Sequence, residues 1–216
     1  MCFKRSTFNW LIGFLGTSAA VAVSYRWIDR IVALWVHDHL RHPHHETLAQ
    51  VGSVPDPSIL FALFGLVLLG MRAVTNRLLS KHEMTALVGC NAIIVFEALK
   101  DQLKVFFGRT WPETWVQNNP SFIKDGAYGF HFMQGGIAFR SFPSGHMGAV
   151  CVVLTVLWAC YPKYRWLYLI AGLAAGTGLV AGNYHFLSDV LAGAFVGIST
   201  GWVALEIWKA SPRFAA

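Results

Sequence analysis

The feature that most constrains this chain is a series of long apolar runs, separated by stretches that carry Lys and Arg. Runs of about 20 residues cross the hydrocarbon core of a bilayer as helices, because lipid forces backbone polar groups to pair within the segment. The runs are expected at 8–25, 58–74, 84–103, 147–161, 166–184 and 190–208. The sequence therefore predicts an all-α fold, a six-span transmembrane helical bundle.

Composition supports a membrane setting, and repeated apolar runs that cross one bilayer predict a single domain over residues 1–216. The chain is 55% hydrophobic and only 13% charged, whereas soluble domains carry about a quarter charged residues. Its net charge of +6 comes from Lys and Arg spread along the sequence. A nucleic-acid interface would gather such residues into a stripe. We therefore expect membrane lipids, and no nucleic acid, as partners.

The basic residues between the runs predict the orientation of the bundle. They occur at four sites that alternate onto one side: Lys4 and Arg5, Arg77 and Lys81, Lys163 and Arg165, Lys209 and Arg213. The positive-inside rule makes this side cytoplasmic. The external side then receives segments 26–57 and 104–146 and the turn at 184–189. Residues 26–40 alternate apolar and polar side chains in the spacing of an amphipathic interfacial helix, so 26–57 is predicted to be an external interfacial segment.

The first apolar run has a second interpretation, as a cleaved signal peptide. Ala20-Val21-Ala22 resembles a small-residue cleavage site. The run is long for a signal peptide, however, and the spans that follow need helices to pack against. We expect it to be retained, and cleavage would leave the other loops on the same sides.

Three polar clusters fall at the external ends of the predicted spans. They are 104–112, 141–146 and 183–189. Ionisable residues at the rim or interior of a membrane bundle are energetically expensive and are usually functional. Their common level and side predict one external active site at the helix ends.

The residue types in these clusters suit the chemistry of an anion. Lys104 and Arg109 flank an aromatic turn and offer charge-assisted hydrogen bonds to a phosphate. Gly145 lies at the start of a span, where free N–H groups and the helix dipole favour negative charge. His185 and Asp189 are spaced i,i+4, which on a helical turn places them on one face. An aspartate bonded to one ring nitrogen makes the other nitrogen the better nucleophile.

In order and spacing, these clusters resemble the motifs of the type 2 phosphatidic acid phosphatase family, the membrane relatives of acid phosphatases and vanadium haloperoxidases. The family motifs are Lys, six residues, Arg-Pro; then Pro-Ser-Gly-His; then Ser-Arg, five residues, His, three residues, Asp. Pro143-Ser-Gly-His146 matches the second motif, and His185 with Asp189 matches the end of the third. The resemblance begins at about residue 58 and implies a catalytic core at 58–208.

This resemblance implies a metal-free lipid phosphate or diphosphate phosphatase without a cofactor. His185 attacks phosphorus to give a phosphohistidine, Asp189 orients it, and His146 protonates the leaving oxygen and then activates water. The implied phosphate contacts are Lys104, Arg109, Arg140, Ser144 and the backbone of Gly145. The resemblance also implies a bacterial inner membrane, with the active site facing the periplasm, and a lipid phosphate as substrate.

Two arginines of the family pattern are absent. Trp111 stands where the first motif has Arg, and Leu179 where the third has Arg. Arg109 matches an additional arginine that many relatives carry. Arg140 is the expected replacement cation, and Lys100, one turn before Lys104, is a weaker candidate. The sequence therefore predicts a rebuilt phosphate pocket.

Other functions stay open at this point. A second lipid in place of water would make the chain a lipid-to-lipid phosphotransferase. A further alternative is a non-catalytic lipid-binding or transport protein that retains the fold, and the missing arginines are the best support for it. A separate histidine-rich stretch suggests a metal cluster; it contains His37, His39, His42, His44 and His45. His44 and His45 are adjacent and Pro43 interrupts the spacing, whereas metal ligation needs defined geometry. We expect a solvated external loop.

Overall fold

A computed structural model describes residues 2–40, 57–75, 79–115 and 118–210, and within these ranges its regular structure is helical, without strands. This confirms the all-α prediction. The helices are α1 (Cys2–Val23), α2 (Asp29–His39), α4 (Pro57–Val74), α5 (Lys81–Phe107), α6 (Phe122–Asp125), α7 (Gly145–Cys160), α8 (Arg165–Ala181) and α9 (Leu187–Ala210).

Three helical segments are long and apolar enough to cross a membrane. They are Thr7–His39, Lys81–Phe107 and Leu187–Ala210, and the apolar helices Ile59–Arg72 and Gly145–Cys160 are shorter. Large apolar side chains such as Phe61 on α4 and Leu173 on α8 face outward. Such an apolar exterior suits lipid rather than water, so the chain is a membrane protein.

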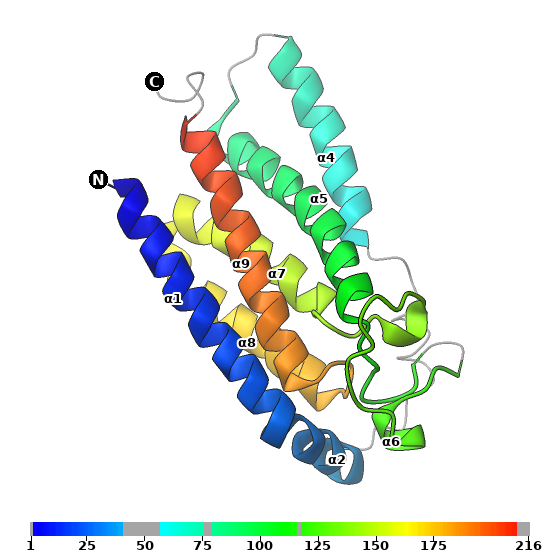
Figure 1. Ribbon diagram of the computed structural model, residues 1–216. Coiled ribbons are helices and arrows are strands. Elements are labelled where there is room, and N and C mark those ends of the chain that lie inside the picture. Colours follow the sequence, from blue (N-terminus) through cyan, green and yellow to red (C-terminus); the bar gives the residue numbers. More distant parts are fainter. Residues whose placement is uncertain (1, 41–56, 76–78, 116–117, 211–216) are drawn as a thin grey trace.

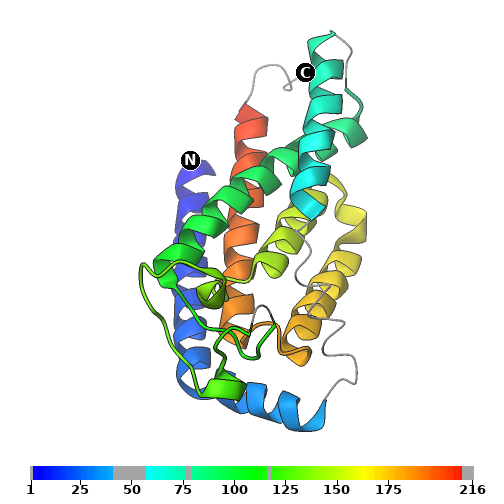
Figure 2. The same ribbon diagram turned by 90° about the vertical axis from the view of Figure 1, so that its right-hand side faces the viewer.

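The centre of the bundle is formed by α5, α7 and α9 (Figures 1 and 2). Helix α1 packs along α9, α4 packs against α5, and α8 packs against α7. Phe96 of α5 is fully buried against Ala149 and Val152 of α7. Buried apolar surface thus joins the three central helices, while the outer helices each cover one of them.

Helices α7 and α9 run parallel and touch through their backbones. A Cβ at Gly193 of α9 would overlap the carbonyl of Ser144, and a Cβ at Gly197 would overlap the carbonyl of Gly148. Small residues four apart allow such close approach between membrane helices. At the starts of these helices, the Ser144 N–H donates to the Asp189 carbonyl at 3.0 Å. The contact therefore fixes the first turns of α7 and α9 side by side.

The first long helix bends before its end. A π-helical turn, Ser24–Ile28, follows α1, and α2 then runs away from the α1 axis (Figure 1). Bends of this kind are typical of π-bulges. The predicted helix at 26–40 is confirmed in α2, which exposes Ile31 and Trp35 and buries Ala33 and Val36. The remainder of the predicted interfacial segment, with His42, His44 and His45, lies outside the described residues.

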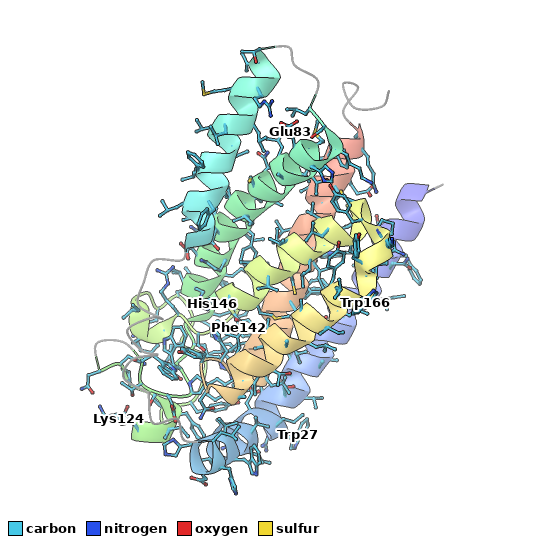
Figure 3. The ribbon with its side chains drawn as sticks, turned by 180° about the vertical axis from the view of Figure 1, so that it is seen from behind. Trp27, Glu83, Lys124, Phe142, His146 and Trp166 are labelled. Atoms are coloured by element: carbon cyan, nitrogen blue, oxygen red, sulfur yellow. The ribbon has the colours of Figure 1, made fainter. Side chains whose placement is uncertain are left out.

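The connection from α5 to α7 covers one end of the bundle. Gly108, with φ +55°, ends α5, and isolated bridges join Arg109 to Phe130 and to Arg140. Figure 3 shows Phe142 and His146 at this end, while Glu83, near the start of α5, lies at the opposite end. The three polar clusters of the sequence are thus assembled at one end of the bundle, where this covering loop lies.

The contact between α7 and α9 predicts the effect of a side chain at Gly197. Gly197→Leu is expected to lower stability by about 1–3 kcal/mol because the added atoms meet the Gly148 backbone. In a chain of this size each kcal/mol shifts Tm by about 2–4 °C. Thermal unfolding in detergent measures the change, with Gly89→Ala as control because nothing lies within 4 Å of a Cβ there. Equal Tm values for the two variants would contradict the contact.

Candidate active site

The residues of the three polar clusters meet where α7 and α9 begin. The rings of His146 and His185 lie 6.3 Å apart, measured between centroids. His185 Nδ1 lies 3.5 Å from Asp189 Oδ2. One site therefore contains two histidines and a carboxylate, which come from segments about 40 residues apart in the chain.

His185 lies in the turn before α9, so the predicted helical turn from His185 to Asp189 is wrong. The two side chains nevertheless come together, because Asp189 stands in the first turn of α9 and reaches back. The contacts of the imidazole, to Asp189 and to Ser141 Oγ at 3.4 Å, are both at Nδ1. These contacts fix the orientation of the ring from its Nδ1 side.

Burial determines the protonation of His185, which is 2% exposed. Its pKa is lowered to about 4, mainly by desolvation; Asp189 opposes the shift, and the nearby positive charges of Lys104 and His146 add to it. The ring is therefore neutral at pH 7. A neutral imidazole has the lone pair that a nucleophile needs.

Both carboxylate oxygens of Asp189 accept hydrogen bonds. Oδ2 accepts from Ser141 Oγ at 2.6 Å and from the Phe186 N–H at 3.1 Å. Oδ1 accepts from Arg109 Nη1 at 2.5 Å. A carboxylate anchored in this way keeps a fixed position beside Nδ1 of His185.

Arg109 differs most from its expected place. Its side chain is fully buried, and its terminal nitrogens contact Asp189, Ser188 and, at 2.8 Å, Asp29 Oδ2. The sequence assigned Arg109 to the substrate phosphate. In the structure its terminal nitrogens are engaged by protein carboxylates and hydroxyls, so Arg109 holds Asp189 in place.

Aromatic rings surround the Arg109 guanidinium. The nearest is Phe186, at 4.4 Å from Cζ to the ring centroid, and Tyr25, Tyr128 and Phe130 lie within 5.4 Å. Burial alone lowers the pKa of Arg109, but Asp189 and Asp29 outweigh it and raise the pKa above its ordinary value. The guanidinium thus stays charged although it is buried among aromatic rings, since two carboxylates and four ring faces stabilise it.

Asp29 belongs to the site although sequence reasoning did not include it. It stands at the start of α2, is 1% exposed, and accepts from the Ser188 N–H at 3.0 Å and from the Ser188 hydroxyl. Asp29, Arg109, Asp189 and His185 form a continuous series of contacts. The only signal in the sequence was a carboxylate beside an apolar run, where an unpaired charge is expensive.

The start of α7 presents backbone donors beside the histidines. Ser144 is the N-cap, and its hydroxyl accepts from the Met147 N–H at 3.3 Å. Gly145 is the first helical residue and His146, the second, is exposed. Ser144 is fully buried, so its placement fits a helix cap whose O–H remains a donor.

The Trp111 ring lies near both His185 and Lys104. Its ring centroid is 5.2 Å from the His185 ring, and Lys104 Nζ lies 5.6 Å from the Trp111 ring. Lys104 is 8% exposed and donates to the Arg140 carbonyl at 2.5 Å. The tryptophan thus packs against the histidine at the place of a family arginine, and Lys104 lies near the same ring.

Leu179 and Arg140 have different surroundings. Leu179 packs against the apolar cluster of Met147, Cys151 and Val190, and its carbonyl accepts from the His185 N–H at 3.3 Å. Arg140 forms an ion pair with Asp101 of α5. The expected replacement cation is therefore engaged by a carboxylate near the site.

The described histidines outside the pair have protein partners. His37 Nδ1 lies 2.5 Å from Glu113 Oε1, His39 contacts the Trp35 carbonyl at 2.9 Å, and the exposed His131 packs edge-on against Phe139. Among the described residues, no group of three or more His, Cys, Asp or Glu side chains has the arrangement of a metal site.

Comparison with known proteins places the site in context. The curated relatives include proteins named lipid A 1-phosphatase from Rhizobium etli and Rhizobium johnstonii, at 32% and 31% identity over 113 residues. Each match covers 52% of this chain, and 44% and 42% of the relatives. A lipid A 1-phosphatase from Porphyromonas gingivalis is 36% identical over 96 residues, 40% of this chain and 22% of that protein. The chain thus spans less than half the length of these relatives.

A family model extends the match across most of the helical core. The PAP2 superfamily model matches residues 84–213, more than half of the chain. That range contains Lys104, the Pro143–His146 motif, His185 and Asp189. The chain belongs to the PAP2 superfamily.

Proposed function

We propose that this protein is a membrane lipid phosphatase that works through a phosphohistidine. The observation that carries the proposal is the grouping of His146, His185 and Asp189, with Asp189 fixed by Arg109. A neutral nucleophile, a group that orients it and an exposed acid–base residue are the parts that phosphoryl transfer needs. The catalytic unit is one domain with its core at 58–208.

The first step forms a bond from His185 Nε2 to phosphorus and breaks the bond from phosphorus to the lipid oxygen. His146 gives its proton to that leaving oxygen, which departs as the lipid alcohol. Asp189 stabilises the positive charge that develops on the His185 ring, through Nδ1. Its fixed position supports this role, because the carboxylate does not have to reorganise during the reaction.

The second step returns the enzyme to its starting state. His146, now neutral, takes a proton from water, the oxygen attacks phosphorus, and the bond from phosphorus to His185 breaks. Inorganic phosphate leaves. A lipid alcohol in place of water would yield a new lipid phosphate by the same bond changes, which makes phosphotransfer the alternative outcome of one mechanism.

Phosphate binding is assigned to the start of α7 and the nearby cations. The Gly145 N–H and the Ser144 O–H supply donors, and the N-terminus of the helix favours an anion. Lys104 provides a cation, and Arg140 provides a second by exchanging Asp101 for the phosphate. Arg109 is a positioning residue that fixes Asp189.

The substrate class follows from the setting of the site and from the relatives. A site at the end of a membrane bundle suits a phosphate carried on a lipid, and the relatives are named for the removal of a lipid A phosphate. We propose a phosphorylated glycolipid as the first substrate to test. We further propose six spans in a bacterial inner membrane, with the histidines on the periplasmic side. Basic residues such as Lys81, at the opposite end of α5, support this orientation.

Replacement of the nucleophile tests the function directly. His185→Ala is expected to reduce phosphate release to background, because no other group attacks phosphorus. Release is measured from detergent-solubilised protein on a panel of lipid phosphates, with and without an acceptor lipid. His131→Ala is the control, since this histidine is exposed in the covering loop.

The same assay separates the candidate functions. Free phosphate identifies a hydrolase, and a phosphorylated acceptor identifies a phosphotransferase. Activity retained in His185→Ala would refute the assigned nucleophile, and a wild-type protein that neither releases nor transfers phosphate would support a non-catalytic lipid-binding role.

The protonation of His185 predicts the acid side of the pH profile. His185 attacks only when neutral, and its pKa is about 4 instead of the ordinary value of 6.5. As the pH falls, activity that depends on His185 is therefore expected to persist through pH 6.5 and to be lost near pH 4. The pH dependence of kcat/KM measures this limb, and a loss of activity centred at pH 6.5 would contradict the buried setting of the ring.

Asp29 is expected to affect turnover through Arg109. Asp29→Asn removes one of the two carboxylates that hold Arg109, so kcat should fall by about tenfold, equivalent to about 1.4 kcal/mol. KM should change little, because Asp29 is not assigned to substrate. Asp38→Asn, an exposed carboxylate of the same helix, is the control. An effect on Tm alone, with kcat unchanged, would limit Asp29 to a stabilising role.

A further inference from the structure

Lys100 reaches the first residue of α7 from the neighbouring helix α5. A Cβ added to Gly145 would lie 2.9 Å from Lys100 Cδ and 3.7 Å from Lys100 Nζ. The side chain of Lys100 is only 12% exposed, so it is packed between the two helices. The missing side chain at Gly145 thus gives Lys100 room at the first turn of α7.

Glu97 holds this lysine in place. The ammonium of Lys100 donates to Glu97 Oε2, one turn earlier on α5, and lies 3.8 Å from Asp101 Oδ1. An ammonium has three donors, and the pair with Glu97 uses one of them. Donors therefore remain for a ligand at the start of α7.

The charges around this position are unfavourable without an anion. A cation beside the N-terminus of a helix is repelled by the helix dipole. Lys104 and Arg140 lie near the same helix start, joined through the Arg140 carbonyl. Lys100 pairs with Glu97, and Arg140 pairs with Asp101. An anion bound here would therefore stabilise Lys100 beside the positive end of the helix.

We propose that Lys100 binds the phosphate oxygens of the substrate and takes over the role of a family arginine absent at Trp111 or Leu179. The assignment rests on the proposed function of the site. Trp111 packs on His185 and Leu179 packs in an apolar cluster, so neither position supplies charge. Glu97 is the positioning residue for Lys100, and the ligand class is a tetrahedral phosphate oxyanion.

Anion binding by the full-length protein in detergent tests the proposal without requiring turnover. Inorganic phosphate and orthovanadate are the probes, and the concentration dependence of thermal stabilisation gives their affinity. Lys100→Met is expected to weaken binding by about tenfold or more, the effect of one charge-assisted hydrogen bond. Lys209→Met is the matched control, because Lys209 forms the same i,i+3 pair with Glu206 at the far end of α9.

The double variant Glu97→Gln with Lys100→Met separates binding from structure. Lys100→Met alone leaves the buried carboxylate of Glu97 unpaired, which lowers stability. Glu97→Gln removes that unpaired charge. If Lys100 binds phosphate, the double variant regains the wild-type Tm but keeps the weak affinity. An affinity restored together with Tm, or wild-type affinity in Lys100→Met, would overturn the proposal.

Lipid phosphate release in the same variants keeps the two proposals distinct. Wild-type protein that binds orthovanadate through Lys100 but releases no phosphate would refute the phosphatase and leave Lys100 as an anion-binding residue. Normal phosphate release with an unchanged KM in the double variant would refute the role of Lys100 and leave the phosphatase intact.

Discussion

The backbone contact between α7 and α9 is the constraint on which the rest of the structure depends. Gly193 and Gly197 let the carbonyls of α7 approach α9 directly, and the Ser144 N–H reaches the Asp189 carbonyl. Because both helices begin at this contact, the first turn of each faces the other. The separation of His146 and His185 is therefore set by main-chain packing, which is stiffer than contact between long side chains.

A buried charge network supports that arrangement from the other side. Arg109 joins Asp29 of α2 to Asp189 of α9, across segments that are about 80 residues apart in the chain. Removing one partner from a buried pair costs about 3–5 kcal/mol, because the remaining charge stays desolvated. The network thus binds the bend after α1, the covering loop and α9 into one unit, and it holds the carboxylate that orients His185.

The sequence predicts where the histidines and the aspartate meet better than it predicts what the cations contact. The proximity of His185 and Asp189 was predicted and is confirmed, although the helical turn between them is not present. Arg109 was expected on the phosphate, yet it is buried against carboxylates. The spacing of a motif shows which residues lie near one another along the chain, but it does not show whether a guanidinium turns toward a ligand or toward the core.

The sequence by itself determined the helical class, the membrane setting and the gathering of the polar clusters at helix ends, since apolar length and local spacing are properties of neighbouring residues. Only the tertiary structure decided that Asp29 joins the site, that Trp111 packs on His185, and that Lys100 reaches Gly145. These contacts join residues far apart in the chain. They depend on how closely α5, α7 and α9 approach one another. That distance is determined by the shapes of many side chains at once.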